Sequence, residues 1–320
     1  MSASKHRNSS KIIVWVLLVV CLLALVYLFQ QSYMKKDDAS AVPTTSSGQR
    51  YTFELAADES KNRDELSADS VNLDRLRQRF LNTTTANINT SQLDAEINAI
   101  ISQNPDITFG ISIKDLGTGA VYDYGSSEAM TAASVTKVLT AVDYLKQVEL
   151  GNRSLSTKMA NGYTAQQNIE QMIVVSDNDA WHILNENLGY SQMQQYAHSI
   201  GLTSYDYTDN TISSSHTTKL LGDIYGRTLI NESNTQLLLS YMERANYRDL
   251  IIPAVPTYDT VYHKAGEYLV NLNDATIITN ETDTIVLTIF TESKSTYNKP
   301  RISSLMQQIT TPTLATFKLN

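Results

Sequence analysis

The sequence predicts an α+β domain in which strands from the two ends of one region share an antiparallel sheet, while the helices between them form a second lobe. Two observations predict this fold. Segments with alternating apolar residues stand near the start and near the end of the chain after residue 90, and a run of helical patterns separates them. We find no internal repeat, and the region is long enough to bury a sizeable core.

The N-terminus carries the pattern of a membrane-spanning helix. Residues 12–29 are apolar and uncharged, which is long enough to cross roughly 30 Å of hydrocarbon. Three basic residues precede this run, which favours an N-terminus inside the cytoplasm. We expect a cytoplasmic tail at 1–11, an anchor at 12–30 and the remaining chain outside the cytoplasm of a single-pass membrane protein. A cleaved signal peptide is the alternative.

The segment after the anchor is rich in Ser, Thr, Asn, Asp and Ala, which predicts a flexible spacer at 31–90 with one short helical stretch near 72–80. Cys21 is the only cysteine, so the exported part can form no disulfide within itself. Residues 37–320 hold 20 basic and 33 acidic side chains, and their formal net charge is therefore −13. Such a charge argues against nucleic acid as a partner.

The predicted domain at 91–320 opens with a helix and a hairpin. Ser91 and Asp94 resemble a capping box, and the apolar residues that follow at helical spacing predict a helix at 91–103. Alternating residues predict strands at 107–114 and 120–124, joined by a glycine-containing turn.

The rest of the domain is predicted to consist of several helices followed by three strands and a last helix. Glycines 151, 189 and 201 stand where helices would end. The helical patterns cover 134–149, 165–175, 179–187, 191–200, 217–229 and 234–244, and the tail has strands at 257–266, 274–279 and 284–290 and a helix near 302–308.

The first chemical motif is Ser134-Val-Thr-Lys137, at the start of a predicted helix. A spacing of three places a hydroxyl and an amine on one helical face, where the amine can take the hydroxyl proton once its pKa is lowered. Alone the motif is weak, because Ser2-Ala-Ser-Lys5 matches it too. By itself, Ser134 would be an ordinary helix N-cap.

Two further motifs follow along the chain. Ser176-Asp177-Asn178 lies at a junction of helices, where a hydroxyl can pass a proton and an amide can hold a lysine and a substrate; alone, it is a helix cap. His263-Lys264-Ala265-Gly266 lies in a strand, where a lysine can bind a carboxylate and a glycine allows close approach; alone, Lys264 is a solvated strand charge.

Together, in this order, the three motifs resemble the signature of class A β-lactamases and penicillin-binding proteins. The resemblance covers residues from about 107 to the C-terminus and implies a β-lactamase/transpeptidase-like fold. It implies that Ser134 attacks an amide or lactam carbonyl, with Lys137 and Ser176 moving protons and no metal or organic cofactor. The implied substrate-binding residues are Asn178, Lys264, Gly266 and Glu267, and the backbone N–H groups of Ser134 and Glu267 would form an oxyanion hole.

The sequence departs from this family in the parts that bind and release the substrate. The stretch 201–218, where class A enzymes carry a deacylating glutamate, has no Glu, although Asp206 or Asp209 could substitute. Ala265 stands where the family usually has Thr or Ser, and alternation along the strand places Glu267 on the same face, where its charge would oppose a substrate carboxylate.

Three functions are therefore open: a β-lactamase with slow or altered turnover, a D,D-peptidase acting on peptidoglycan stem peptides, and a non-catalytic envelope module. The expected partners are a β-lactam or a peptidoglycan peptide, and a membrane through one N-terminal helix. The sequence does not fix the oligomeric state.

Overall fold

The computed structural model describes residues 88–257 and 259–319. The predicted cytoplasmic tail, anchor and nearly all of the spacer lie outside these ranges and stay predictions. Within the described ranges, no helix combines the length and the hydropathy needed to cross a membrane.

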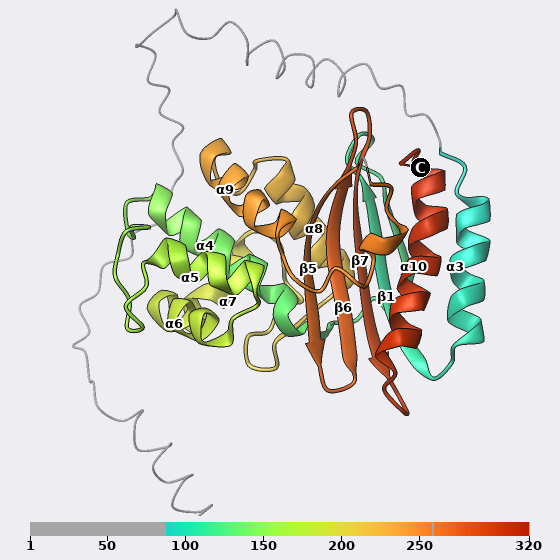
Figure 1. The fold of residues 1–320 in the computed structure, drawn as a ribbon, viewed down its shortest axis with the longest axis horizontal. Helices are drawn as coiled ribbons and strands as arrows, with labels where there is room; N and C mark the ends of the chain where they lie inside the picture. Colours follow the sequence, from blue (N-terminus) through green and yellow to red (C-terminus); the bar gives the residue numbers. More distant parts are fainter. Residues whose placement is uncertain (1–87, 258, 320) are drawn as a thin grey trace, which may run out of the picture. The chain divides into compact units, whose positions relative to one another are not determined.

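One five-stranded sheet organises the described part of the chain (Figure 1). Its order is β2-β1-β7-β6-β5, and every neighbouring pair is antiparallel. The sheet therefore joins strands from the two ends of the domain, as the sequence predicts, and leaves β5 at an edge. The strands are β1 (Ile107–Asp115), β2 (Val121–Gly125), β5 (Thr260–Tyr268), β6 (Asn271–Thr279) and β7 (Thr284–Ser293).

Two helices, α3 (Ser91–Gln103) and α10 (Lys299–Thr316), cover one face of the sheet (Figure 1). Leu93 and Ile97 of α3 pack with apolar residues of α10 and of β1 in one buried cluster. The final helix is longer than the predicted 302–308 at both ends, and it begins at Lys299 because Asn298 caps its N-terminus by accepting a hydrogen bond from Arg301 N.

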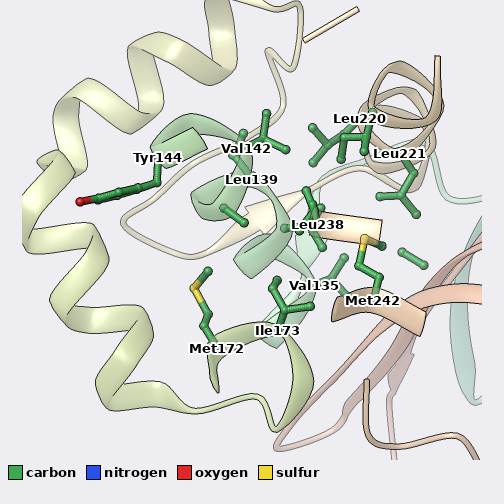
Figure 2. Close-up of a cluster of buried hydrophobic side chains, with 14 of the residues drawn as sticks. Val135, Leu139, Val142, Tyr144, Met172, Ile173, Leu220, Leu221, Leu238 and Met242 are labelled. Carbon is green, nitrogen blue, oxygen red and sulfur yellow. The ribbon is translucent and has the colours of Figure 1, made fainter. Parts of the chain in front are cut away.

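The opposite face of the sheet meets a helical lobe with α4 at its centre. Figure 2 shows Leu139 and Val142 of α4 packed among apolar side chains of the surrounding helices. Burial on all sides makes α4 a rigid base for whatever stands at its N-terminus. The lobe contains α4 (Lys137–Glu149), α5 (Ala165–Val174), α6 (Asn178–Leu188), α7 (Tyr190–Ser199), α8 (Ser214–Tyr225) and α9 (Glu232–Glu243).

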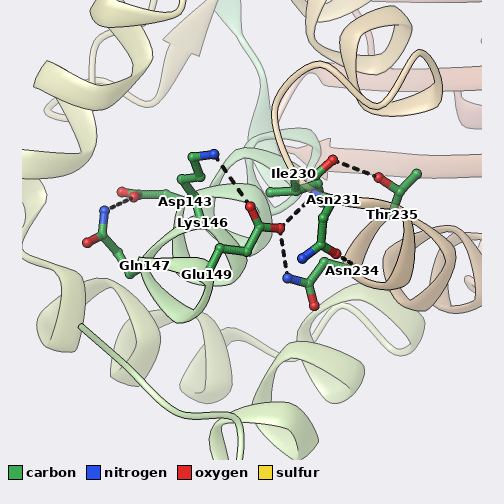
Figure 3. A network of polar contacts seen from close by, with 8 residues as sticks. All are labelled: Asp143, Lys146, Gln147, Glu149, Ile230, Asn231, Asn234 and Thr235. Atoms are coloured by element: carbon green, nitrogen blue, oxygen red, sulfur yellow. Dashed lines mark hydrogen bonds and ion pairs between the residues drawn. The ribbon is translucent and has the colours of Figure 1, made fainter. Parts of the chain in front are cut away.

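A carboxylate fixes the C-terminal end of α4 to the start of α9 (Figure 3). Glu149 Oε1 accepts hydrogen bonds from Asn231 N at 2.7 Å and Asn234 Nδ2 at 2.9 Å. Its other oxygen lies 3.4 Å from Lys146 Nζ. A negative charge at a helix N-terminus is favourable, so this contact stabilises the start of α9 and ties it to α4.

Several predicted boundaries are corrected by local hydrogen bonds. The helix predicted from Ser134 begins as a 3-10 turn over Ala133–Thr136, and the α-helix starts only at Lys137. Thr90, and not Ser91, is the N-cap of α3, and its hydroxyl donates to Asp94. Helix α8 begins three residues earlier than predicted because Ser213 Oγ accepts from His216 N.

The three glycines predicted to end helices all have positive φ: 75° at Gly151, 91° at Gly189 and 84° at Gly201. Residues with a Cβ rarely adopt this conformation, which explains why glycine stands there.

Candidate active site

The site forms where the N-terminus of α4 meets the edge strand β5. Ser134 is the second residue of the 3-10 turn Ala133–Thr136, and Lys137 follows it by three positions. Side chains three apart eclipse one another in a 3-10 helix, so the two side chains share one side of the turn. The 3-10 turn therefore allows the predicted pairing of Ser134 with Lys137 at least as well as the α-helix predicted from the sequence.

The Lys137 amine reaches the second motif. Lys137 Nζ donates to Ser176 O at 2.6 Å, to Ser176 Oγ at 3.3 Å and to Asn178 Oδ1 at 2.7 Å. The side chain is fully buried, and its amine lies 5.5 Å from the ring centre of Trp181. Burial lowers the pKa of Lys137 to about 8, although the charge of Asp177 acts in the opposite direction.

The third motif converges on the same hydroxyl. Lys264 Nζ donates to Ser176 Oγ at 2.9 Å, and its side chain is only 1% exposed. Burial, reinforced by the positive charge of Lys137, lowers the pKa of Lys264 to about 7, while Asp274 opposes this shift. The Ser176 hydroxyl therefore stands between two amines whose pKa values lie near neutrality.

Local structure explains how Ser176 and Asn178 come to face Lys137. Asp177 is the N-cap of α6, and its Oδ1 accepts from Ala180 N at 2.7 Å. Ser176 itself has a φ of 61°, an unfavourable left-handed conformation for a residue with a Cβ. The middle residue of the motif thus forms the helix cap, and the two flanking residues carry the contacts to the lysines.

Gly266 is the point where the sheet touches the turn. An added Cβ at this position would lie 2.5 Å from Ala132 O and 2.9 Å from Ser134 N. Only glycine allows β5 to approach the backbone of Ser134 so closely. Asn273 of the neighbouring strand strengthens the junction, because its Nδ2 donates to Thr131 O at 2.8 Å.

The expectation for the side chains of Ala265 and Glu267 is wrong in one respect. They share a face of β5, but this face packs on α10, away from Ser176: Ala265 belongs to the cluster under α10. The Glu267 carboxylate accepts from Tyr297 Oη at 2.5 Å and Lys299 Nζ at 2.9 Å. Its charge is compensated there and does not oppose a ligand beside Lys264.

The backbone of Glu267 remains available at the sheet edge. Tyr268 pairs with Asn271 across a two-residue turn, so Glu267 occupies the next, non-hydrogen-bonded position of the ladder. At such a position in an edge strand, the N–H points outward. Ser134 lies near the start of a helical segment, where N–H groups lack partners within the helix. The two predicted oxyanion donors therefore flank the Gly266 contact.

The two aspartates considered as substitutes for a glutamate serve the loop itself or face solvent. Asp206 Oδ1 accepts from Thr208 N at 2.7 Å and from Asp209 N at 3.3 Å, which closes a tight turn. These backbone contacts hold the pKa of Asp206 below its usual value. Asp209 is exposed.

Sequence reasoning missed two residues that support the site: Trp181 and Asn210. Trp181 covers the Lys137 amine, and its indole N–H donates to Thr140 Oγ1 at 3.0 Å. Asn210 binds the turn that carries Ser134. No motif marks these positions, because each acts through a partner distant in the sequence. In the described ranges, no group of three or more His, Cys, Asp or Glu side chains is arranged to hold a metal ion.

Comparisons with known proteins agree with this geometry. A family model described as the beta-lactamase enzyme family matches residues 92–317. The structure of PBP-A is similar with a TM-score of 0.67 and 22% identity, over 71% of this chain and 96% of PBP-A. A mutant of PBP-A in an acyl-enzyme complex with penicillin G is similar with a TM-score of 0.66 and 22% identity, over 71% of this chain and 97% of the mutant.

A variant of the last common ancestor of Gram-negative bacteria beta-lactamase class A is similar with a TM-score of 0.65 and 18% identity, over 70% of this chain and 98% of the other. Identities this low concern the fold alone. No curated protein matches the chain.

Proposed function

The chain belongs to the beta-lactamase enzyme family, and from this membership and the geometry of the site we propose that it is a serine hydrolase that opens β-lactam bonds through an acyl-enzyme on Ser134 and releases the acyl group slowly. The observation that carries the proposal is the Ser176 hydroxyl, which lies 3.3 Å from the Lys137 amine and 2.9 Å from the Lys264 amine.

Acylation needs a base for the Ser134 proton and an acid for the leaving nitrogen. In the proposed step, Ser134 Oγ bonds to the lactam carbonyl carbon, its proton passes to the neutral Lys137 amine, and the C–N bond breaks. Ser176 then gives its proton to the ring nitrogen and regains one from a lysine. With a pKa of about 8 for Lys137, a fraction of this amine is neutral at pH 7.

Charge that develops on the carbonyl oxygen also needs a partner. The N–H groups of Ser134 and Glu267 are the proposed donors, and the Gly266 contact fixes their separation. The Lys264 ammonium and Asn178 would bind the carboxylate and the amide of the substrate. In this account Glu267 acts through its backbone only, since its carboxylate is held by Tyr297 and Lys299.

Slow deacylation is proposed because no carboxylate in the described stretch 201–218 is held ready to activate water. The stretch 201–218 contains no Glu, the Asp206 carboxylate closes a turn, and Asp209 is exposed. The acyl group on Ser134 would therefore persist after the ring has opened.

A D,D-peptidase is the second candidate, favoured by the similarity to PBP-A and by the same missing glutamate. The same residues would then attack the terminal amide of a peptidoglycan stem peptide. A non-catalytic envelope module is the third candidate, and it requires that Ser134 form no acyl bond at all.

We also propose that residues 12–30 anchor the protein and that the catalytic domain lies outside the cytoplasm. The support is the uncharged apolar run with basic residues before it. Protease treatment of intact spheroplasts tests this: the domain should be digested without lysis, whereas protection until lysis would contradict the orientation.

The function is tested with full-length protein in detergent and a chromogenic cephalosporin. One equivalent of colour followed by a slow steady rate, with one adduct in the intact mass, supports the proposal. Continuous rapid turnover contradicts slow deacylation, and absence of both colour and adduct contradicts an acyl-enzyme. Because Ser134→Ala removes the nucleophile, this variant should give neither colour nor adduct. Cleavage of D-Ala-D-Ala peptides by the wild type, with a permanent cephalosporin adduct, would favour the peptidase.

A further inference from the structure

The residue before the proposed nucleophile has an unfavourable backbone conformation. Ala133 has a φ of 51°, in the left-handed region that residues with a Cβ seldom adopt. This conformation turns the chain from β3 (Met130–Thr131) into the 3-10 turn. Something outside the turn must hold it, because Ala133 has no intrinsic preference for it.

The holding contact comes from Asn210, 77 positions away in the loop 201–213 between α7 and α8. Asn210 Nδ2 donates to Ala133 O at 2.9 Å, and Asn210 Oδ1 accepts from Thr136 Oγ1 at 2.6 Å. One amide therefore binds the first and the last residue of the 3-10 turn, and Ser134 lies between them.

The backbone around Asn210 reinforces this clamp. Asn210 O accepts from Ala132 N at 3.0 Å, and β3 pairs with β4 (Thr211–Ile212) directly after Asn210. Asn210 also has a left-handed φ of 51°, which asparagine tolerates better than most residues. Two unfavourable conformations thus face each other across one set of hydrogen bonds.

We propose that Asn210 is a positioning residue for acylation: it holds the 3-10 turn so that the hydroxyl and the N–H of Ser134 point into the site. The inference rests on the proposed acyl-enzyme function. Both ends of the amide are required. An aspartate at this position would place a carboxylate oxygen against the Ala133 carbonyl, where a donor is needed, and an alanine would contact neither Ala133 nor Thr136.

The test measures acylation of the full-length chain by benzylpenicillin, with intact mass read at successive times and several concentrations. This separates the acylation rate constant from the non-covalent dissociation constant. For Asn210→Ala and Asn210→Asp we expect the rate constant to fall by roughly 100-fold, the order expected when a reacting group is displaced by about 1 Å. The dissociation constant should change little, because Lys264 and Asn178 remain in place.

Matched variants separate positioning from general damage. Thr136→Val removes the hydroxyl donor at nearly constant volume and should slow acylation, whereas Thr136→Ser keeps the hydroxyl and should restore it. Asp209→Ala changes an exposed side chain of the same loop and should acylate like the wild type. Because glycine adopts positive φ readily, Asn210→Ala should cost less in an Ala133→Gly background than in the wild type.

The outcomes distinguish this inference from the proposed function. If the wild type forms no adduct, the proposed function fails. If the wild type forms the adduct, and the folded variants Asn210→Ala and Thr136→Val are acylated as fast as the wild type, the positioning role is wrong. If Asn210→Ala loses both the labelling and the thermal unfolding transition, this variant is not folded, and Thr136→Val is compared with Thr136→Ser instead. Equal acylation rate constants in these two variants would also overturn the inference.

Discussion

Two regions meet at the turn that carries Ser134, and their chemistry differs. On one side, α4, β5 and the turn before α6 supply two buried lysines and the Ser176 hydroxyl, which lies 3.3 Å from the Lys137 amine and 2.9 Å from the Lys264 amine. On the other side, the loop 201–213 contributes an amide, through Asn210. In the proposed mechanism, forming the acyl bond uses the first region, and rapid release would need a base in the second. The comparison therefore separates the residues proposed for acylation from those that rapid deacylation would require.

The largest expected effect comes from removing the proposed base, Lys137, from the region that holds the two lysines. Replacing Lys137 by Met keeps much of the buried volume but removes the proposed base, and the acylation rate constant should fall by about 10²–10⁴-fold. Stopped-flow or timed intact-mass measurements with benzylpenicillin check this. Thermal unfolding in parallel serves as the control, and an unchanged acylation rate in a folded variant would remove Lys137 from the mechanism.

The second effect concerns the free energy of unfolding and a buried ion pair between β5, which carries Lys264, and β6. His263 and Asp274 form a fully buried pair with Nδ1 and Oδ1 3.1 Å apart, and His263 Nε2 lies 3.1 Å from Ala245 O. Since that carbonyl can only accept, Nε2 must carry a proton. Asp274→Ala leaves this imidazole without its partner and should lower the free energy of unfolding by about 3–5 kcal/mol.

Urea unfolding at pH 7 measures the loss in Asp274→Ala. A change of less than about 1 kcal/mol would show that the pair is not a structural support of β5. Asp283→Ala, at a half-buried turn position, is a comparison variant expected to lower the free energy of unfolding far less than Asp274→Ala does.

The third effect is the pH dependence of acylation. Lys137 and Lys264 have pKa values lowered by burial to about 8 and about 7, and the proposed base must be neutral. The acylation rate constant should therefore rise as the pH increases from 6 to 8.5, with apparent values that belong to the coupled pair. A rate independent of pH across this range would argue against an amine as the base.

The smallest effect concerns the loop side. His216 Nδ1 accepts from Ser204 N at 3.1 Å and is 2.6 Å from Ser204 Oγ, which holds the loop only while the imidazole is neutral. Burial, helped by the charge of Lys219, lowers the pKa of His216. Its contribution to stability is therefore complete above the ordinary histidine pKa of about 6.5 and is lost as the pH falls through the lower folded value.

Limited proteolysis of the loop between pH 7.5 and 5 checks this prediction. Cleavage should accelerate at low pH in the wild type, and His216→Asn should flatten the difference. Equal acid sensitivity in both proteins would contradict the role of His216.

The sequence predicted the fold and the convergence of three motifs because these depend on local patterns: alternation in strands, apolar spacing in helices, and three short motifs. The strands near both ends of the domain pair as expected. The edge strand β5 carries Lys264 and Gly266 on the face that meets the helical lobe, since residues two apart share a face of a strand.

What the sequence did not reveal depends on long-range contacts. The left-handed conformation of Ala133 is invisible to propensity, because the contacts that hold it come from Asn210. The prediction that the Glu267 side chain faces the substrate carboxylate is wrong, because alternation says which residues share a face of a strand, and not which layer covers that face. Tyr297, just before α10, and Lys299, the first residue of α10, bind the Glu267 carboxylate on the face that α10 covers.

Whether Ser134 is the acylated residue is tested most directly by tandem mass spectrometry of the protein digested after exposure to benzylpenicillin. We expect one penicilloyl group, located on Ser134 and still present hours after free penicillin is removed. A modification on any other residue, or full labelling of Ser134→Ala, would contradict it.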